Sequence, residues 1–310
     1  MKKTKRRLFY IALVVFILMN IVSFFHAHKF THYTDKRVTK TTEASKLTMT
    51  DKIKTLFFGI NNPRPENYQF PKQDYDTVYI QSNKLISGWL TKKDNSIGTV
   101  IVFHGFSGEK SGMLDKSDIF LQLGFNTFLI DFMGSGASEG NQTTIGYYEA
   151  EEVKSSYDYI SHLGETNIIL YGTSMGAVAI IKAIHDYKIN PKSIIIECPY
   201  STMYRTVCNR FESMHLPEFP MAGLLTFWGG LQNGFWAYGM KPVEFAKGIN
   251  CPTLLMYGEL DNKVYRDEID EIFANIQGPK KLILFPNAGH ENYLNLNSDK
   301  WIMEVKLFLN

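Results

Sequence analysis

The sequence predicts an α/β fold, in which helices cover both faces of a mostly parallel, twisted sheet. From Asp76 onward, short and almost continuously apolar runs alternate with amphipathic stretches, as expected for strands covered on both faces. With 45% hydrophobic and 21% charged residues, a chain of 310 residues can bury a sizeable core. The composition therefore excludes wholesale disorder, a collagen-like fibre and a protein with many membrane spans.

Eight runs of the chain are predicted as strands. Thr77–Ile80 and Leu85–Leu90 are close enough to form an antiparallel hairpin at one edge of the sheet. The buried parallel strands are expected at Thr99–Phe103, Thr127–Asp131, Asn167–Tyr171, Ser193–Glu197, Thr253–Tyr257 and Leu282–Phe285. Apolar residues at helical spacing predict helices over Tyr147–His162, Ser174–Tyr187, Arg266–Ile276 and Asp299–Leu309.

One long interval breaks the alternation of strands and helices. It separates Glu197 from Thr253 by 55 residues, far more than a usual crossover, and it is rich in Phe, Trp and Met. We expect residues 200–245 to form a small helical cap over the carboxyl ends of the strands. The alternative is an ordinary crossover helix followed by a long loop.

The amino-terminal segment has the composition of a membrane span. Leu8–Phe25 is an uncharged run of 18 residues in which only Asn20 and Ser23 are polar. As a helix it would reach about 27 Å, close to the ~30 Å hydrocarbon core of a bilayer. A buried core helix is the alternative, but it would have to be apolar on every face.

The exit from this run favours an uncleaved anchor over a cleaved signal peptide. Ser23–His28 presents large side chains where a signal peptidase requires small ones. We therefore expect residues 1–30 to be a membrane anchor and residues 31–60, which are rich in Thr, Lys, Asp and Ser, to be a tether. Residues 61–310 then form the folded domain.

The distribution of basic residues predicts the orientation of this anchor. Five basic residues precede the span, whereas four are spread over the fifteen residues after it: Lys2, Lys3, Lys5, Arg6 and Arg7 against Lys29, Lys36, Arg37 and Lys40. Positive charge near a span tends to stay in the cytoplasm. The amino terminus is therefore expected inside and the folded domain on the periplasmic or extracellular side.

Charge and cysteine content exclude several classes of partner. A net charge of +2 from 33 basic and 31 acidic side chains, with five of the basic ones in the leader, predicts no nucleic-acid partner. The three cysteines, Cys198, Cys208 and Cys251, are too few for a disulfide scaffold or a four-cysteine zinc site. Pairing of Cys198 with Cys208 stays open, and we expect neither a cofactor nor a metal.

The strongest chemical motif is Gly172-Thr173-Ser174-Met175-Gly176, which follows a predicted strand and opens a predicted helix. A G-x-S-x-G turn between a strand and a helix lifts the serine hydroxyl clear of the sheet. Ser174 is therefore the predicted nucleophile. The alternative is a serine that only caps the helix.

A serine nucleophile needs a base, and the base needs an acid to orient it. Asp261 follows the strand Thr253–Tyr257, and His290 follows the last strand. Because the carboxyl ends of parallel strands meet at one edge of the sheet, we expect both residues beside Ser174. Glu259 is the rival acid, and His104 precedes the nucleophile in a different motif.

That motif is His104-Gly105-Phe106-Ser107-Gly108-Glu109, directly after the strand Thr99–Phe103. A tetrahedral intermediate needs two donors aimed at its oxygen. We expect these donors to be the backbone N–H groups of Phe106 and Met175. His104 is expected to brace this loop by hydrogen bonding.

Together these motifs resemble the α/β-hydrolase fold, and among its members the monoacylglycerol-lipase and serine-aminopeptidase-like branch. The matching stretches are His104–Glu109, Asp131–Gly140, Gly172–Gly176, Gly258–Val264 and Gly289–Glu291. The resemblance implies a twisted, mostly parallel sheet with a short helical cap, and a serine hydrolase with Ser174, Asp261 and His290 as its triad. Met133 and Ser135 depart from the residues usual in relatives, which affects the inference of substrate and not of chemistry.

The expected function is that of a membrane-anchored serine hydrolase cleaving an acyl bond, in the first place a carboxylic ester. The aromatic insertion suggests an apolar acyl group in a small or lipid-like ester, with Trp228 and Trp236 lining the acyl pocket. Three alternatives stay open: a thioesterase, a binding module without activity, and an aminopeptidase with a cap carboxylate that holds the substrate ammonium, for which the candidates are Glu212, Glu218 and Glu244.

Overall fold

The computed structural model describes the whole chain except residues 1, 35–37, 42–47, 49, 52–53 and 56–58. It divides into two compact units, which we describe separately. The helical unit consists of Met1–Pro63 and Met203–Met240, and the sheet unit consists of Arg64–Thr202 and Lys241–Asn310. Much of the predicted tether, residues 31–60, lies outside the described residues.

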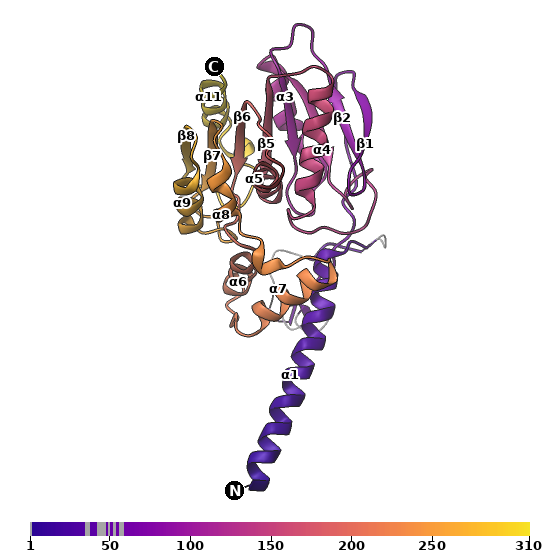
Figure 1. Ribbon diagram of the computed structural model, residues 1–310, viewed down its shortest axis with the longest axis vertical. Helices are drawn as coiled ribbons and strands as arrows, with labels where there is room; N and C mark the ends of the chain where they lie inside the picture. The colour runs from indigo at the N-terminus through magenta and orange to yellow at the C-terminus, as the bar shows by residue number, and fades with distance from the viewer. Residues whose placement is uncertain (1, 35–37, 42–47, 49, 52–53, 56–58) are drawn as a thin grey trace. The chain divides into compact units, whose positions relative to one another are not determined.

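The sheet unit is built on one eight-stranded sheet with the order β1-β2-β4-β3-β5-β6-β7-β8 (Figure 1). The two edge strands β1 and β2 pair antiparallel, β2 also pairs antiparallel with β4, and all other neighbours are parallel. All eight strands were predicted: β1 (Asp76–Gln81), β2 (Leu85–Thr91), β3 (Thr99–Phe103), β4 (Asn126–Asp131), β5 (Ile168–Thr173), β6 (Ser193–Glu197), β7 (Thr253–Gly258) and β8 (Lys280–Phe285).

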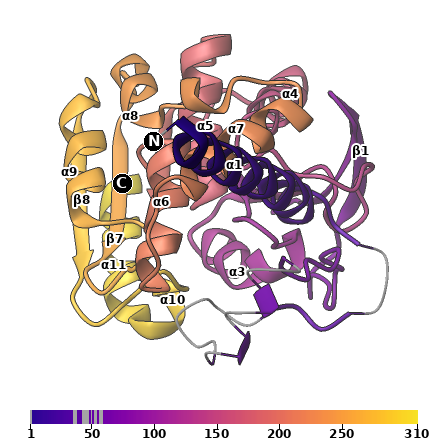
Figure 2. The ribbon, with the colours of Figure 1, turned by 90° about the horizontal axis from the view of Figure 1, so that it is seen from below.

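Helices cover both faces of this sheet (Figure 2). The predicted helices are α4 (Glu149–His162), α5 (Met175–Tyr187), α9 (Arg266–Asn275) and α11 (Ser298–Leu309), and the additional ones are α3 (Leu114–Gln122), α8 (Pro242–Phe245), α10 (Tyr293–Leu296) and the 3-10 helices η2 (Lys110–Met113) and η4 (Ala246–Gly248). Successive side chains of a strand point to opposite faces. Val100 and Val102 of β3 accordingly join Phe120 of α3 and Trp301 of α11 in one core, while α4 and α5 lie over the other face.

The helix α3 was not predicted because its apolar residues do not follow a clear helical spacing. The segment LDKSDIFLQ has three charged residues in its first five positions, and its apolar residues lie mainly at its end. Phe120 and Leu121 are nevertheless buried, and Phe120 packs edge-on against Trp301 with 5.9 Å between the ring centroids. The tertiary core therefore stabilises this helix more than its own sequence pattern does.

The helical unit contains α1 (Lys2–Thr31), α6 (Met203–Ser213), α7 (Met221–Gln232) and the 3-10 helix η3 (Ala237–Gly239). The prediction that the long insertion is helical is confirmed, and its placement over the strands stays a prediction. Within this unit, Cys208 and Phe211 of α6 pack with Ala222 of α7.

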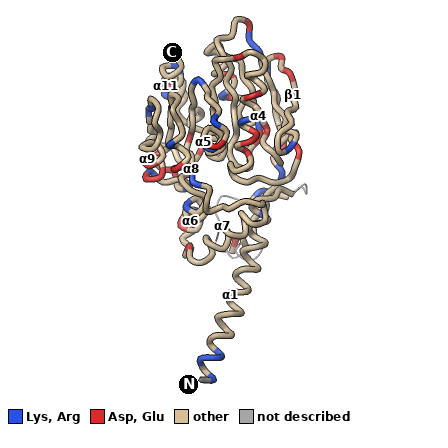
Figure 3. Tube along the Cα trace, in the orientation of Figure 1, with Lys and Arg blue, Asp and Glu red and all other residues tan. Residues whose placement is uncertain are grey.

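Helix α1 contains the whole predicted span. Among the described residues it is the one helix long and apolar enough to cross a membrane, and its most apolar stretch of 18 residues has a mean hydropathy of 2.6. Figure 3 shows basic residues at its amino end and an uncharged stretch after them. Such a helix fits a membrane anchor or a signal sequence equally well by length and composition.

Candidate active site

Ser174 sits on a strained turn between β5 and α5. Its backbone has φ 50° and ψ −111°, a combination that residues other than glycine rarely adopt. The flanking glycines are required by close backbone contacts, since a Cβ on Gly172 would come within 2.6 Å of the Gly176 backbone and one on Gly176 within 2.6 Å of Phe103 O. The structure thus has the strand, turn and helix that the motif predicted.

The structure brings Ser174, His290 and Asp261 into one chain of hydrogen bonds. His290 Nε2 lies 3.0 Å from Ser174 Oγ, and His290 Nδ1 lies 2.7 Å from Asp261 Oδ2. A neutral imidazole that donates from Nδ1 to the carboxylate presents Nε2 as an acceptor for the serine proton. Ser174 makes no side-chain capping bond to α5, so its hydroxyl serves His290 instead of the helix.

Asp261 is held by its own loop in the position that His290 needs. Its side chain is fully buried, and its Oδ1 accepts the backbone N–H groups of Lys263 at 2.8 Å and Val264 at 3.0 Å. The other oxygen is therefore left to orient the imidazole. Glu259, the rival acid, lies 3.6 Å from Arg266 and is partly exposed, so the geometry favours Asp261.

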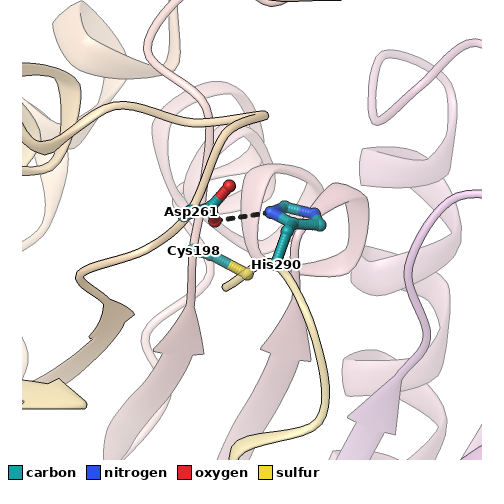
Figure 4. A group of neighbouring side chains, drawn as sticks. All are labelled: Cys198, Asp261 and His290. Atoms are coloured by element: carbon teal, nitrogen blue, oxygen red, sulfur yellow. Dashed lines mark hydrogen bonds and ion pairs between the residues drawn. The ribbon is translucent and has the colours of Figure 1, made fainter. Parts of the chain in front are cut away.

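Cys198 is a third neighbour of His290 that the sequence analysis did not place in the site (Figure 4). It directly follows β6, so the rule that functional side chains follow strand ends could have indicated it. Burial alone would lower the pKa of His290, but the Cys198 sulfur and the Asp261 carboxylate outweigh burial and raise it above the usual 6.5. All three cysteines are free thiols in this structure.

The same three side chains have the donor atoms of a metal site. One ligand atom each from Cys198, Asp261 and His290 lies within 4.8 Å of the others, and sulfur, carboxylate and imidazole are ligands that zinc accepts. However, the short bond from His290 Nδ1 to Asp261 already uses the atoms that would bind a metal. We therefore assign no metal to this cluster.

The loop after β3 lies beside the nucleophile. A Cβ on Gly105 would be 3.6 Å from Ser174 Cβ, and Phe106 lies in the turn closed by the hydrogen bond from Gly108 N–H to Gly105 O at 3.2 Å. Met175 is the first residue of α5, and the first N–H groups of a helix have no partner within it. This arrangement suits the two predicted oxyanion donors, whose role stays a prediction.

His104 braces this loop, as the sequence predicted. Its buried ring accepts the Phe132 N–H at Nε2, at 3.0 Å, and its Nδ1 lies 2.8 Å from Gly105 O. Burial lowers the pKa of His104, which favours the neutral ring that an accepting Nε2 requires. The side chain thus ties the ends of β3 and β4 together.

A buried ion pair supports the same region and was not predicted. Lys110 Nζ lies 2.5 Å from Asp131 Oδ2, and both side chains are fully buried. Asp131 Oδ1 also accepts the Lys110 N–H at 2.7 Å, and Ala137 N–H donates to Oδ2 at 3.0 Å. The pair therefore joins the end of the loop that contains Phe106 to the glycine-rich loop after β4.

The two tryptophans expected in the acyl pocket have different surroundings. The Trp228 indole donates to Asn20 at 3.1 Å, and its ring packs edge-on against Phe24, so this side chain contacts α1; its role in an acyl pocket stays a prediction. Trp236 packs against Tyr238 at 5.1 Å between ring centroids and is largely exposed. Its place in a pocket stays a prediction.

A cavity of about 300 Å³ in the sheet unit does not belong to this site. Its lining includes Thr99 and Asn126, which begin β3 and β4, and Glu165. Ser174, Asp261 and His290 instead follow the carboxyl ends of their strands. The cavity therefore lies at the opposite edge of the parallel strands from the nucleophile.

Comparison with known proteins identifies a matching family and a relative. Residues 94–222 match the family described as serine aminopeptidase, S33, a region that includes Ser174 but neither Asp261 nor His290. The uncharacterized protein YqkD of Bacillus subtilis (strain 168) is 25% identical over 230 residues, which cover 72% of this chain and 75% of YqkD.

Two solved esterases have a similar fold. The Pyrococcus furiosus esterase Pf2001 has a TM-score of 0.67 and 23% identity, over 80% of this chain and 96% of the esterase. The esterase EaEST of Exiguobacterium antarcticum has a TM-score of 0.57 and 19% identity, over 76% of this chain and 99% of EaEST. These structural similarities confirm the fold that the motifs indicated.

Proposed function

This chain is a serine hydrolase with the α/β-hydrolase fold, and we propose that it cleaves a carboxylic ester through an acyl-enzyme on Ser174. The observation that carries the proposal is the hydrogen-bonded chain from Ser174 through His290 to Asp261, with distances of 3.0 and 2.7 Å. These are the distances over which a base can take a serine proton and an acid can hold the base in the right tautomer.

The proposed reaction begins when His290 Nε2 removes the proton of Ser174 as its oxygen attacks the ester carbonyl carbon. The carbonyl oxygen gains negative charge, which the backbone N–H groups of Phe106 and Met175 stabilise. Asp261 stabilises the imidazolium that forms. His290 then gives its proton to the leaving alkoxide, so the alcohol departs and the acyl group remains on Ser174.

Water completes the cycle by the same route. His290 takes a proton from water, the resulting hydroxide attacks the acyl carbon, and the tetrahedral intermediate collapses as the proton returns to Ser174. The acid leaves and the enzyme is restored. The neutral imidazole is needed at the start of both halves, so both depend on the pKa of His290.

An ester with an apolar acyl group is the substrate class that we propose first. Both solved structures compared above are those of esterases, and the insertion Met203–Met240 is rich in apolar and aromatic side chains. An aminopeptidase is the second candidate, because the matched family is described as one. It would need a free carboxylate for the substrate ammonium, and among the predicted ones Glu244 is exposed and bound to Lys247 at 2.6 Å.

A substrate panel tests these alternatives. We expect purified wild-type protein to hydrolyse p-nitrophenyl butyrate and octanoate faster than the acetate, and to leave aminoacyl p-nitroanilides and acyl thioesters nearly untouched. Ser174→Ala should abolish the activity, whereas Ser161→Ala, on the exposed face of α4, should preserve it. Faster cleavage of the aminoacyl anilides would replace the ester assignment by the aminopeptidase, and faster cleavage of thioesters by the thioesterase.

The membrane location is also part of the proposal. We infer that α1 anchors the protein, with its basic amino end in the cytoplasm and the hydrolase domain on the periplasmic or extracellular side, since five basic residues precede the apolar run. Protease added to intact spheroplasts should then degrade the domain. Protection until lysis would reverse the orientation, and release of the domain into the medium would identify α1 as a cleaved signal.

A further inference from the structure

The helical unit carries a long segment without charge whose large side chains are exposed. Phe219–Met240 is 22 residues long and contains no Lys, Arg, Asp, Glu or His. Its exposed side chains include Phe219 at 84%, Trp236 at 62% and Leu231 at 58%. Soluble proteins rarely leave such apolar surface in water, and a surface of this kind marks contact with a partner or a membrane.

Helix α7, within this segment, lies against the carboxyl-terminal part of α1 (Figure 1). Trp228 Nε1–H donates to Asn20 Oδ1 at 3.1 Å, and the ring centroids of Trp228 and Phe24 are 5.3 Å apart. Gln232 Nε2 donates to Phe24 O at 2.8 Å. Several independent contacts therefore fix α7 to one stretch of α1.

The contacts cover both polar side chains of the apolar run Leu8–Phe25. Asn20 meets Trp228, and the buried Ser23 hydroxyl donates to Met221 Sδ at 3.8 Å. A polar side chain in hydrocarbon is costly unless another protein group satisfies it, and neighbouring helices do so in membrane proteins. The two polar residues thus behave as helix contacts within a bilayer.

If α1 spans a bilayer, the position of these contacts along α1 gives the depth of α7 in the membrane. Asn20 lies five residues before Phe25, where the apolar run ends, which corresponds to about 7.5 Å along the helix at ~1.5 Å per residue. Interfacial helices lie with their apolar face about 5–10 Å into the boundary between headgroups and acyl chains. The depth of Trp228 therefore matches that of an interfacial helix.

We propose that Phe219–Met240 is an interfacial membrane segment, with Phe219, Phe227, Leu231 and Trp236 in contact with lipid acyl chains in the leaflet where α1 ends. This inference rests on the proposed anchoring by α1. It gives Trp236 a lipid neighbour in place of the acyl group of a substrate. Because the segment lies between β6 and β7 in the chain, the hydrolase domain would be joined to the membrane at two points of its sequence.

Fluorescence quenching in vesicles tests this proposal on the full chain. The protein is reconstituted in phosphatidylcholine and phosphatidylglycerol with and without bromine on the acyl chains, and the emission of Trp236 is the difference between wild type and Trp236→Phe. We expect brominated lipid to quench this emission at least twofold and aqueous iodide to change it little. Trp89 and Trp301, which are buried in the sheet unit, should respond to neither quencher.

A charged substitution and its matched control strengthen the test. Leu231→Glu should reduce the quenching of Trp236 by brominated lipid, whereas Leu163→Glu should leave it unchanged, since Leu163 is equally exposed, at 59%, but lies at the end of α4 in the sheet unit. Emission of Trp236 that responds to iodide instead of bromine would overturn the proposal. Emission that responds to neither quencher would overturn it in favour of a protein pocket.

Flotation of the same vesicles separates this inference from the proposed anchor. If the chain floats with the vesicles and Trp236 is not quenched by bromine, only the interfacial segment is wrong. If the chain does not float, the anchor itself is wrong and this inference fails with it. Hydrolysis of p-nitrophenyl butyrate, measured on the same samples, reports separately on the proposed chemistry.

Discussion

The sheet unit and the helical unit differ in which side chains they bury and which they expose. The sheet unit buries charged groups and gives each a partner within the chain, such as Lys110 with Asp131 and Glu197 with Trp301. The helical unit exposes large apolar side chains along α1 and after α6, and it pairs the buried Ser23 only weakly. We therefore expect the sheet unit to be stabilised by its own contacts and the stability of the helical unit to depend on the membrane proposed around it.

The largest effect is expected where the internal contacts of the sheet unit carry the chemistry. His290→Ala removes the base, so kcat for p-nitrophenyl butyrate should fall by about 10⁴–10⁶-fold, and adding Ser174→Ala should lower it little further because a triad acts as a unit. His162→Ala, at the carboxyl end of α4, is a control that should leave kcat unchanged. A His290→Ala enzyme with a tenth of wild-type activity would exclude His290 as the base.

The next largest effect is expected at the buried ion pair. Lys110→Met leaves the Asp131 carboxylate buried without its cation, which should reduce the free energy of unfolding in urea by about 3–5 kcal/mol. Adding Asp131→Asn should recover part of this loss, because no charge is then left unpaired and the amide oxygen can still accept a backbone N–H. A double variant less stable than Lys110→Met would show that the unpaired carboxylate is not the cause of the loss.

The same pair gives a stability that depends on pH. Burial would raise the pKa of Asp131, but Lys110 outweighs burial and lowers it below 3.8. A lowered pKa means that the carboxylate stabilises the fold above the unfolded value and that this contribution is lost as the pH falls through the folded value. In urea unfolding, the destabilisation by Lys110→Met should therefore be large at pH 7 and shrink in acid below pH 3.8.

Most of the sheet unit could be predicted from the sequence, because its information is local. Eight apolar runs gave eight strands, and the G-x-S-x-G turn located Ser174 between β5 and α5. Asp261 and His290 followed from one rule, that strand ends meet at one edge of a parallel sheet. The distances between these side chains come from the structure, because local sequence patterns do not contain them.

What could not be predicted depends on contacts between distant residues. Lys110 and Asp131 are 21 positions apart, and nothing in either local pattern pairs them. Cys198 approaches His290 only once β6 and the last loop are in place, and Trp228 meets Asn20 across 208 positions. The contact of Trp228 with α1 was not foreseen, because a count of aromatic residues does not tell which of them pack on another helix.

A pair of tryptophan substitutions tests whether the two units differ in what stabilises them. Trp301→Phe removes the donor to the buried Glu197 carboxyl, at 2.7 Å, and should reduce the free energy of unfolding of the sheet unit by about 2–3 kcal/mol in any medium. Trp228→Phe removes a neutral hydrogen bond to Asn20 and should cost about 1 kcal/mol. Thermal unfolding in detergent micelles and in bilayers would compare them.

The two variants should respond differently to the surrounding medium. Trp301→Phe should reduce the free energy of unfolding equally in micelles and bilayers, because Trp301 is surrounded by protein. Trp228→Phe should reduce it more in bilayers, where no water reaches Asn20. An equal loss of stability by Trp228→Phe in both media would contradict the dependence of the helical unit on its environment.

The smallest effect is a shift in a pH profile. Because the pKa of His290 is raised above 6.5 and the base must be neutral, kcat/KM should increase with pH through a midpoint above 6.5. Asp261→Asn removes a charge that favours the imidazolium and should move this midpoint to lower pH. An unchanged midpoint in the folded variant would mean that Asp261 does not interact with the titrating base.

Active-site labelling is the most direct test of the claim that Ser174 is an activated nucleophile. The full chain, purified in detergent, is treated with a fluorophosphonate, digested and examined by mass spectrometry. We predict one adduct, on Ser174, which disappears in Ser174→Ala and is strongly reduced in folded His290→Ala. An adduct on another residue, or undiminished labelling of folded Ser174→Ala, would exclude Ser174 as the activated nucleophile.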